Sequence, residues 1–315
     1  MNGSADRITR RQCLGLIAGA AAASLAPALC RAENDSKLLR VAISAETLAG
    51  ANINDARAAY LLWIDAVSRE FGHSTAVTVP GLFIPTEEMI RGIRQGTIDC
   101  YGVTALELAK IADLTDPGEV VLQDYLAEGI EYVLLVHNGS KYKTVADLRG
   151  AQMLTHLHRD MVLLQVWLGT LLAANSLPPA ERFFGSLSPR DKVNQVLLPV
   201  FFRNADGACL ARRSWETAVE LNPQLGRDLR ALAVSPKIIP IAIGFRRNCD
   251  AIGRKALIDS MLRISNSNAG QQITAFYGAR RFVVRPASCM KETLEMVRQF
   301  ERVSAQRAGP RKGKS

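Results

Sequence analysis

The sequence predicts an α/β protein with two lobes, in each of which helices flank a mixed, mainly parallel sheet. Short apolar runs rich in branched residues alternate with stretches of helical periodicity along most of the chain. This alternation occurs in two successive sets, and strands that alternate with helices pair into parallel or mixed sheets. A length of 315 residues with 48% hydrophobic residues is sufficient for two domains, each with its own core.

The first set of elements begins with a buried strand at residues 38–43, where the run is apolar and branched. Residues 54–71 then carry the apolar stripe of an amphipathic helix, and residues 75–79 alternate like a second strand. A further helix begins at residue 85, because acidic residues occupy its first turn and arginines its last, and it ends before Gly96.

A third strand is expected at residues 97–103, and Thr104 is placed to cap a helix over residues 105–112. The later strands follow the same apolar pattern. They are expected at residues 120–122, 132–136, 152–154, 207–210, 231–235 and 238–245. The later helices are expected at residues 144–150, as a short turn, and at 161–174, 193–201, 214–221, 251–264 and 291–303.

The N-terminal segment, residues 1–32, is typical of an export signal. Arginines precede a small apolar stretch at residues 14–29, and the paired Arg10 and Arg11 are typical of a twin-arginine signal. An ordinary secretory signal is the alternative, and either route ends outside the cytoplasm with cleavage near residue 32. No later run of about 18 apolar residues predicts a membrane span.

The net charge of the chain is +9, which is a modest excess of basic residues. Removal of residues 1–32, which carry four arginines and one aspartate, leaves +6. Part of that charge lies in residues 307–315, a segment with glycine and proline that is expected to be a disordered basic tail. We find no basic stripe of the kind that nucleic acid requires, so the excess favours attraction of small anions.

Four cysteines follow the export signal, and none has CxxC spacing. Cys100 and Cys209 fall inside apolar strand-like runs and are expected to be buried as small hydrophobic residues. Cys249 and Cys289 follow strand-like runs at polar turns, so they are the better candidates for a disulfide in an oxidising compartment.

Four short phrases of the chain, in this order and spacing, resemble the type 2 periplasmic binding fold. Within that fold they are similar to the phosphate/phosphonate-type (PhnD-like) substrate-binding family of ABC transporters, over residues 38–302. The phrases are RQGTIDCYG at 94–102, KTVADLRGA at 143–151, NADGA at 204–208 and SPKIIP at 235–240.

The resemblance implies two lobes joined by crossover segments, with residues 33–126 and 236–306 in the first lobe and 127–235 in the second. A small anion would bind in the cleft between them, where helix N-termini favour anions. Closure over the ligand would be recognised by the permease of a membrane transporter or by a membrane-bound sensor. A monomer without a cofactor, and without affinity for nucleic acid, is implied.

Position in the fold nominates ligand-binding residues on both lobes. They are Ser44, Glu46, Thr47, Tyr101 and Thr104 on the first lobe, and Thr155, His156, His158, Arg159 and Asp206 on the second. The family usually carries a loop rich in serine, threonine and glycine where this chain has THLHRD at 155–160. An arginine fork and a histidine can hold a carboxylate, sulfonate or phosphate ester as well as a phosphonate, although Arg159 could also lie on the solvent face of a helix start.

Two other classes of chemistry have weaker support in the sequence. His156 and His158 with Asp160 could be metal ligands, but alternate residues of an extended loop point in opposite directions. An enzyme that uses the cleft would need an activated nucleophile, and neither a GxSxG elbow nor an exposed reactive cysteine is predicted. The sequence therefore predicts a binding protein and not an enzyme, with no metal site.

Overall fold

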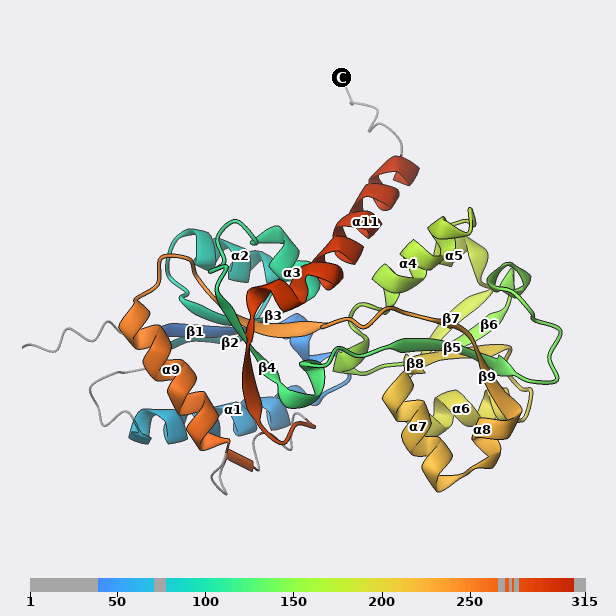
Figure 1. Cartoon of the computed structure of the whole chain (residues 1–315), viewed down its shortest axis with the longest axis horizontal. Coiled ribbons are helices and arrows are strands. Elements are labelled where there is room, and N and C mark those ends of the chain that lie inside the picture. Colours follow the sequence, from blue (N-terminus) through green and yellow to red (C-terminus); the bar gives the residue numbers. More distant parts are fainter. Residues whose placement is uncertain (1–38, 71–77, 266–269, 272–273, 275–277, 309–315) are drawn as a thin grey trace, which may run out of the picture. The chain divides into compact units, whose positions relative to one another are not determined.

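The computed structural model describes residues 39–70, 78–265, 270–271, 274 and 278–308. Among these residues, eleven strands form two mixed sheets (Figure 1). The first sheet has the order β11–β4–β10–β3–β1–β2 and the second has the order β7–β6–β8–β5–β9. The predicted export signal and the end of the tail lie outside the described residues.

The strands of the first sheet come from both ends of the chain. They are β1 (Arg40–Ser44), β2 (Thr78–Ile84), β3 (Cys100–Thr104), β4 (Glu119–Gln123), β10 (Ile241–Phe245) and β11 (Phe282–Pro286). The strands of the second sheet are contiguous in sequence. They are β5 (Tyr132–His137), β6 (Gln152–His156), β7 (Ser186–Arg190), β8 (Gly207–Ala211) and β9 (Leu229–Val234).

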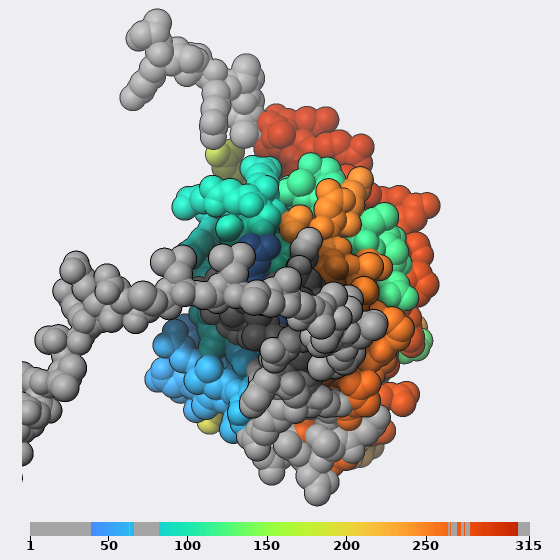
Figure 2. Space-filling model, turned by 90° about the vertical axis from the view of Figure 1, so that its left-hand side faces the viewer, coloured from blue at the N-terminus to red at the C-terminus, as the bar shows by residue number. Residues whose placement is uncertain are grey.

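Helices cover both faces of each sheet (Figure 1). Those that flank the first sheet are α1 (Ile53–Glu70) and α9 (Ala251–Ile264) on one face, and α2 (Thr86–Arg94), α3 (Ala105–Lys110) and the start of α11 (Lys291–Ala308) on the other. Those that flank the second sheet are α4 (Leu164–Ala174) and α5 (Ala180–Phe183) on one face, and α6 (Val193–Phe201), α7 (Arg212–Leu221) and α8 (Gln224–Asp228) on the other. Figure 2 shows the face on which α2 (teal), α1 (light blue) and α9 (orange) reach the surface.

The two sheets are mixed, as predicted, but parallel pairs do not predominate. In the first sheet β1 pairs in parallel with β2 and β3, whereas β10 runs antiparallel to β3 and β4, and β11 runs antiparallel to β4. In the second sheet β6 is parallel to β7 and β8, and β5 is antiparallel to β8 and β9. The antiparallel pairs arise because each sheet receives strands, such as β5 and β10, that follow segments crossing from the other sheet.

Two strands were not predicted, and both lie at a sheet edge. Strand β7, with the sequence SLSPR, is half-buried to exposed and lies at an edge of the second sheet. Strand β11 lies at an edge of the first sheet, beside β4. An edge strand is not buried on both faces, so it does not need the continuous apolar run that identifies a central strand. Helix α11 extends to Ala308, so the first two residues of the predicted tail are helical.

Cys249 and Cys289, the candidates for a disulfide, are not bonded to each other in the structure, where the four described cysteines are free thiols. Cys249 packs against the apolar cluster between the first sheet and helices α1 and α9. Cys289 packs against the larger cluster on the other face of that sheet. Because the sheet separates the two clusters, the two sulfur atoms cannot meet. Cys100 and Cys209 are fully buried, as predicted.

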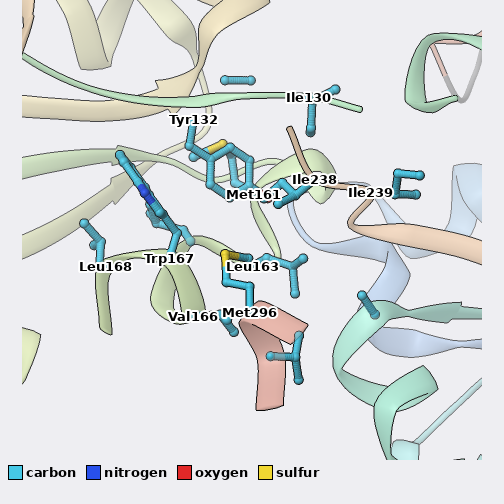
Figure 3. Packing of buried hydrophobic residues seen from close by; sticks show 14 of the residues in the cluster. Ile130, Tyr132, Met161, Leu163, Val166, Trp167, Leu168, Ile238, Ile239 and Met296 are labelled. Carbon is cyan, nitrogen blue, oxygen red and sulfur yellow. The ribbon is translucent and has the colours of Figure 1, made fainter. Parts of the chain in front are cut away.

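The C-terminal helix α11 is anchored to α4 through one continuous apolar cluster. Figure 3 shows Met296 of α11 directed toward Leu163 and Val166, below the Tyr132 ring. The rings of Tyr132 and Trp167 meet edge to face with centroids 6.0 Å apart. A chain segment that begins beside the first sheet is therefore held to a helix of the second sheet by buried side chains.

This packing predicts that Met296→Ala lowers the free energy of unfolding by about 2–5 kcal/mol, because a buried methionine is replaced by a cavity. The measurement is urea-induced unfolding followed by circular dichroism. Glu295→Ala, at an exposed position of the same helix, is the matched control and should change stability by less than about 0.5 kcal/mol. Equal effects of the two substitutions would contradict the anchoring role of Met296.

Candidate ligand-binding site

The carboxyl ends of parallel strands bring the predicted site residues of each sheet to one edge. In the first sheet, β1 ends at Ser44 and β3 ends at Thr104. In the second sheet, β6 ends at His156, and the parallel strand β8 ends one residue before the start of α7 at Arg212. Because parallel strands end at the same edge, residues that follow them lie close together, which is where open α/β sheets bind ligands.

At the edge of the first sheet, the hydroxyl groups converge on a carboxylate of the protein itself, that of Glu107. Ser44 Oγ donates to Glu107 Oε1 at 2.5 Å, and Thr86 Oγ1 donates to the same oxygen at 2.7 Å. The backbone N–H and the hydroxyl of Thr104 both donate to Oε2 at 2.9 Å. Glu107 is 2% exposed, and its own N–H bonds back to Thr104 in a capping box at the start of α3.

The predicted helix cap at Thr104 is confirmed, whereas ligand contact by Ser44 and Thr104 stays a prediction. Both were expected to donate to a bound anion, but both hydroxyl groups already donate to Glu107. The helix start that would favour an anion has a glutamate as its capping partner. The Thr-x-x-Glu spacing is a signature of the capping box, so this partner could have been found from the sequence.

Tyr101 and Asp206 are also placed away from the predicted cleft. Tyr101 is fully buried in the core of the first sheet, where its hydroxyl bonds to Thr115 Oγ1 at 2.8 Å and to the Phe245 carbonyl at 3.1 Å. Asp206 precedes β8, at the amino edge of the parallel strands. Its carboxylate accepts hydrogen bonds from Tyr142 Oη at 2.6 Å and from the Gln152 N–H at 2.8 Å. The hydroxyl of Tyr101 and the carboxylate of Asp206 thus have partners within the protein, and their contact with a ligand stays a prediction.

At the carboxyl edge of the second sheet, Asp160 is the centre of a cluster of charged groups. The 3₁₀ turn Arg159–Met161 follows β6, and His158 Nδ1 caps it by accepting a hydrogen bond from the Asp160 N–H at 3.2 Å. The Asp160 carboxylate is nearly inaccessible. It accepts a hydrogen bond from Tyr125 Oη at 2.8 Å and lies 3.5 Å from Arg213 Nη2.

Two guanidinium groups lie beside this carboxylate. Arg159 donates from Nη2 to Gln123 Oε1 at 3.2 Å and to Tyr125 Oη at 3.0 Å, which joins the two sheets at this point. The guanidinium of Arg213 stacks 4.0 Å above the centre of the Tyr125 ring. A Cβ atom built on Gly278 would lie 3.8 Å from Arg213 Nη2 and 4.0 Å from Arg159 Nη2. Gly278 therefore lies beside both guanidinium groups.

The predicted histidines complete the same edge. The rings of His156 and His158 are stacked, with centroids 5.3 Å apart. Burial lowers the pKa of His156, and burial also lowers the pKa of His158 despite the Asp160 carboxylate, with smaller contributions from His156 and the two arginines. Both imidazoles are therefore held neutral around pH 7. Within the described ranges, no group of His, Cys, Asp and Glu side chains could hold a metal ion.

The other predicted residues have varied positions. Thr47 is buried and lines a cavity that Arg159 also lines. Thr155 is buried in β6, in register with Pro189 and Cys209 of its neighbours. Glu46 is exposed. Direct contact of these residues with a ligand stays a prediction, and so does contact by His156 and His158.

Sequence reasoning missed three residues that build the site, namely Gln123, Tyr125 and Arg213. Arg213 follows a predicted strand directly, so its position after β8 could have nominated it. Gln123 and Tyr125 belong to the segment that leaves β4, and nothing in the local sequence indicates that Arg159 contacts them.

Two mixed sheets flanked by helices, with a basic cluster at the carboxyl edge, define a solute-binding protein of the periplasmic type. The sequence profile of the family "ABC transporter, phosphonate, periplasmic substrate-binding protein" matches residues 52–287. The chain belongs to this family, which is a family of transporter binding proteins and not of enzymes. No curated protein matched the sequence. None of the helices in the described ranges has the length and apolar content needed to cross a membrane.

Solved structures share this fold at low sequence identity. A binding protein component of an ABC phosphonate transporter from Pseudomonas aeruginosa is 14% identical, with 86% of this chain and 89% of that chain covered and a TM-score of 0.56. PhnD1 from Prochlorococcus marinus, in complex with methylphosphonate, is 14% identical, with 85% and 99% covered and a TM-score of 0.55. A Xanthomonas citri protein bound to ATP is 15% identical, with 86% and 99% covered and a TM-score of 0.57.

The Glu107 cluster predicts that Glu107→Ala lowers the free energy of unfolding by roughly 3 kcal/mol, because a helix cap is lost and buried hydroxyl donors lose their acceptor. Chemical denaturation provides the measurement. Glu87→Ala, at an exposed position in the first turn of α2, is the control and should be nearly neutral. A small effect of Glu107→Ala would show that water or a rearranged side chain satisfies the same donors.

The histidine pair predicts a pH dependence of stability. The folded pKa of each imidazole is lowered from its ordinary value of 6.5, so below about pH 6.5 the unfolded chain binds protons that the folded chain does not. The free energy of unfolding should therefore fall as pH decreases from neutral through that value. Urea unfolding across this range, with the double variant His156→Gln and His158→Gln, is the measurement. An equally steep fall in the double variant would assign the effect to other groups.

Proposed function

We propose that this protein binds a small anion outside the cytoplasm and presents it to the permease of an ABC-type membrane transporter. The observation that carries the proposal is the pair of guanidinium groups, Arg159 and Arg213, that lie beside the Asp160 carboxylate at the carboxyl edge of the second sheet. Guanidinium groups bind carboxylates, sulfonates and phosphonates through charge-assisted hydrogen bonds. Membership of a family of phosphonate transporter binding proteins supports the transport role.

The charge of the cluster supports an anionic ligand. Two guanidinium groups, Arg159 and Arg213, lie beside the single carboxylate of Asp160, and the neutral histidines add no charge. The Arg159 side chain is only 9% exposed, and an anion beside it would interact more strongly than in water. Tyr125 and Gln123 hold the Arg159 guanidinium in place, which reduces the entropy lost on binding.

Closure would be the signal that the permease recognises. Residues 33–126 with 236–306 form one lobe in this proposal, and residues 127–235 form the other. Arg159 already contacts Gln123 and Tyr125 across the proposed boundary, so a ligand at this point would touch both lobes. A ligand with higher affinity for the closed form shifts the population toward it. The protein acts as a monomer without a catalytic step, and residues 1–32 direct its export.

The proposal predicts that the purified protein binds at least one small oxyanion and that Arg213→Ala weakens this binding roughly ten- to hundredfold. Loss of a hydrogen bond to a charged group costs roughly 1.5–3 kcal/mol. Isothermal titration with acetate, methanesulfonate, methylphosphonate and phosphate is the measurement, after native mass spectrometry has shown that no ligand is carried through purification.

The matched control is Arg94→Ala, at an exposed position in the last turn of α2. This variant should bind as tightly as the unmodified protein. If none of the anions binds, or if Arg213→Ala binds as tightly as the control, the anion-binding role of the cluster is wrong.

A further inference from the structure

Gly50 occupies a turn at the carboxyl edge of the first sheet. The turn follows the 3₁₀ segment Ala45–Leu48, and the Ala51 N–H closes it by donating to the Leu48 carbonyl at 2.7 Å. The backbone of Gly50 is left-handed, with a φ of 78°. A residue with a side chain adopts this conformation with strain, so the turn by itself favours glycine.

Gly50 also touches a loop of the second sheet. A Cβ atom built on it would lie 2.5 Å from the carbonyl oxygen of Leu157, 3.0 Å from the carbonyl carbon of Leu157 and 3.3 Å from the Cα atom of His158. These are main-chain atoms, which no change of rotamer moves. Because the conflict arises at Cβ, it is the same for every side chain that could stand at position 50.

The loop that Gly50 touches is fixed on the second sheet. The Leu157 N–H donates to the Arg190 carbonyl at 2.7 Å, at the end of the neighbouring strand β7. The side chain of His158 then caps the turn that begins at Arg159. A retreat of the loop would therefore disturb the turn that carries the Arg159 side chain.

A second glycine separates the requirement of the turn from the requirement of the contact. Gly150 is also left-handed, with a φ of 74°, and it lies at an exposed position before β6. Apart from its chain neighbours, no heavy atom in the described ranges lies within 4 Å of a Cβ atom built on it. The two glycines thus share a backbone conformation, and they differ in whether a neighbouring main chain excludes a side chain.

We propose that Gly50 is a positioning residue for ligand binding, because the two lobes close fully only when position 50 has no side chain. The Leu157 carbonyl is the stop that the first lobe meets on closure. A methyl group at position 50 would have to withdraw by about 1 Å to reach ordinary contact distance. The gap that this opens lies beside the turn of Arg159, where the proposed anion site is. This inference rests on the proposed function and names the residue that sets how far the lobes close.

Incomplete closure weakens binding without removing any group that touches the ligand. The apparent dissociation constant is the intrinsic constant divided by the fraction of protein in the binding-competent form. A side chain at position 50 lowers that fraction, so the apparent affinity falls in proportion. The anion enters while the lobes are apart, so the loss belongs to the dissociation rate and not to the association rate.

The test compares Gly50→Ala with Gly150→Ala in the full mature chain. The probe is whichever of acetate, methanesulfonate, methylphosphonate and phosphate binds the unmodified chain most tightly by isothermal titration. Gly50→Ala should weaken that binding about tenfold, and stopped-flow fluorescence should assign the loss to faster dissociation. Gly150→Ala should bind as tightly as the unmodified chain. Urea unfolding should show a similar loss of stability in both variants, because each places a side chain at a left-handed backbone position.

Small-angle X-ray scattering with saturating anion measures closure directly. Gly50→Phe and Gly150→Phe are the variants, since a ring is a larger wedge than a methyl group. The unmodified chain and Gly150→Phe should become more compact when the anion is added. Gly50→Phe should keep a larger radius of gyration, because the ring holds the two loops apart.

The outcomes separate this inference from the proposed function. If an anion binds, but binds Gly50→Ala as tightly as Gly150→Ala, position 50 does not limit closure and the anion-binding role stands. The same conclusion follows if Gly50→Phe becomes as compact as Gly150→Phe. Slower association with unchanged dissociation would place Gly50 at the entrance of the site and overturn its role in closure. If no anion binds, the proposed function fails and this inference fails with it.

Discussion

The candidate site depends on the buried carboxylate of Asp160. A buried charge is tolerated only when it is paired and hydrogen-bonded, and here Tyr125, Arg213, Arg159 and the turn that His158 caps meet that requirement. The same contacts fix the positions of the two guanidinium groups before any ligand arrives. Asp160 also places one negative charge beside both arginines. The geometry and the charge of the site thus have a common origin.

The central strands of the fold could be predicted from the sequence because they are buried on both faces. Strands β5 and β8 are continuous apolar runs, and each lies between two neighbours in the second sheet. The edge strands β7 and β11 could not be predicted, since all of their residues except Phe282 are partly or fully exposed and no pattern distinguishes them from loops. The sequence also did not predict which neighbouring strands run antiparallel, because that depends on which segments cross between the sheets.

The candidate site was partly predictable, and the reasons differ between residues. Arg159 and His158 follow a strand that ends at the ligand edge, so position alone nominates them. The direction of the Tyr101 side chain could not be predicted because every residue of β3 is buried, and burial on both faces removes the alternation that would show which way a side chain points. The contact of Arg159 with Gln123 and Tyr125 joins segments that are more than thirty residues apart in the chain, so no local pattern reports it.

The carboxylate of Glu107 is the shared hydrogen-bond acceptor at the carboxyl edge of the first sheet. Two side-chain hydroxyl groups, a threonine cap and a helix start are arranged around it as they would be around a bound oxyanion. A single codon change at Glu107 would remove the acceptor that all of these donors share. Loss of the acidic side chain would weaken the fold and, at the same moment, release a ready-made set of donors.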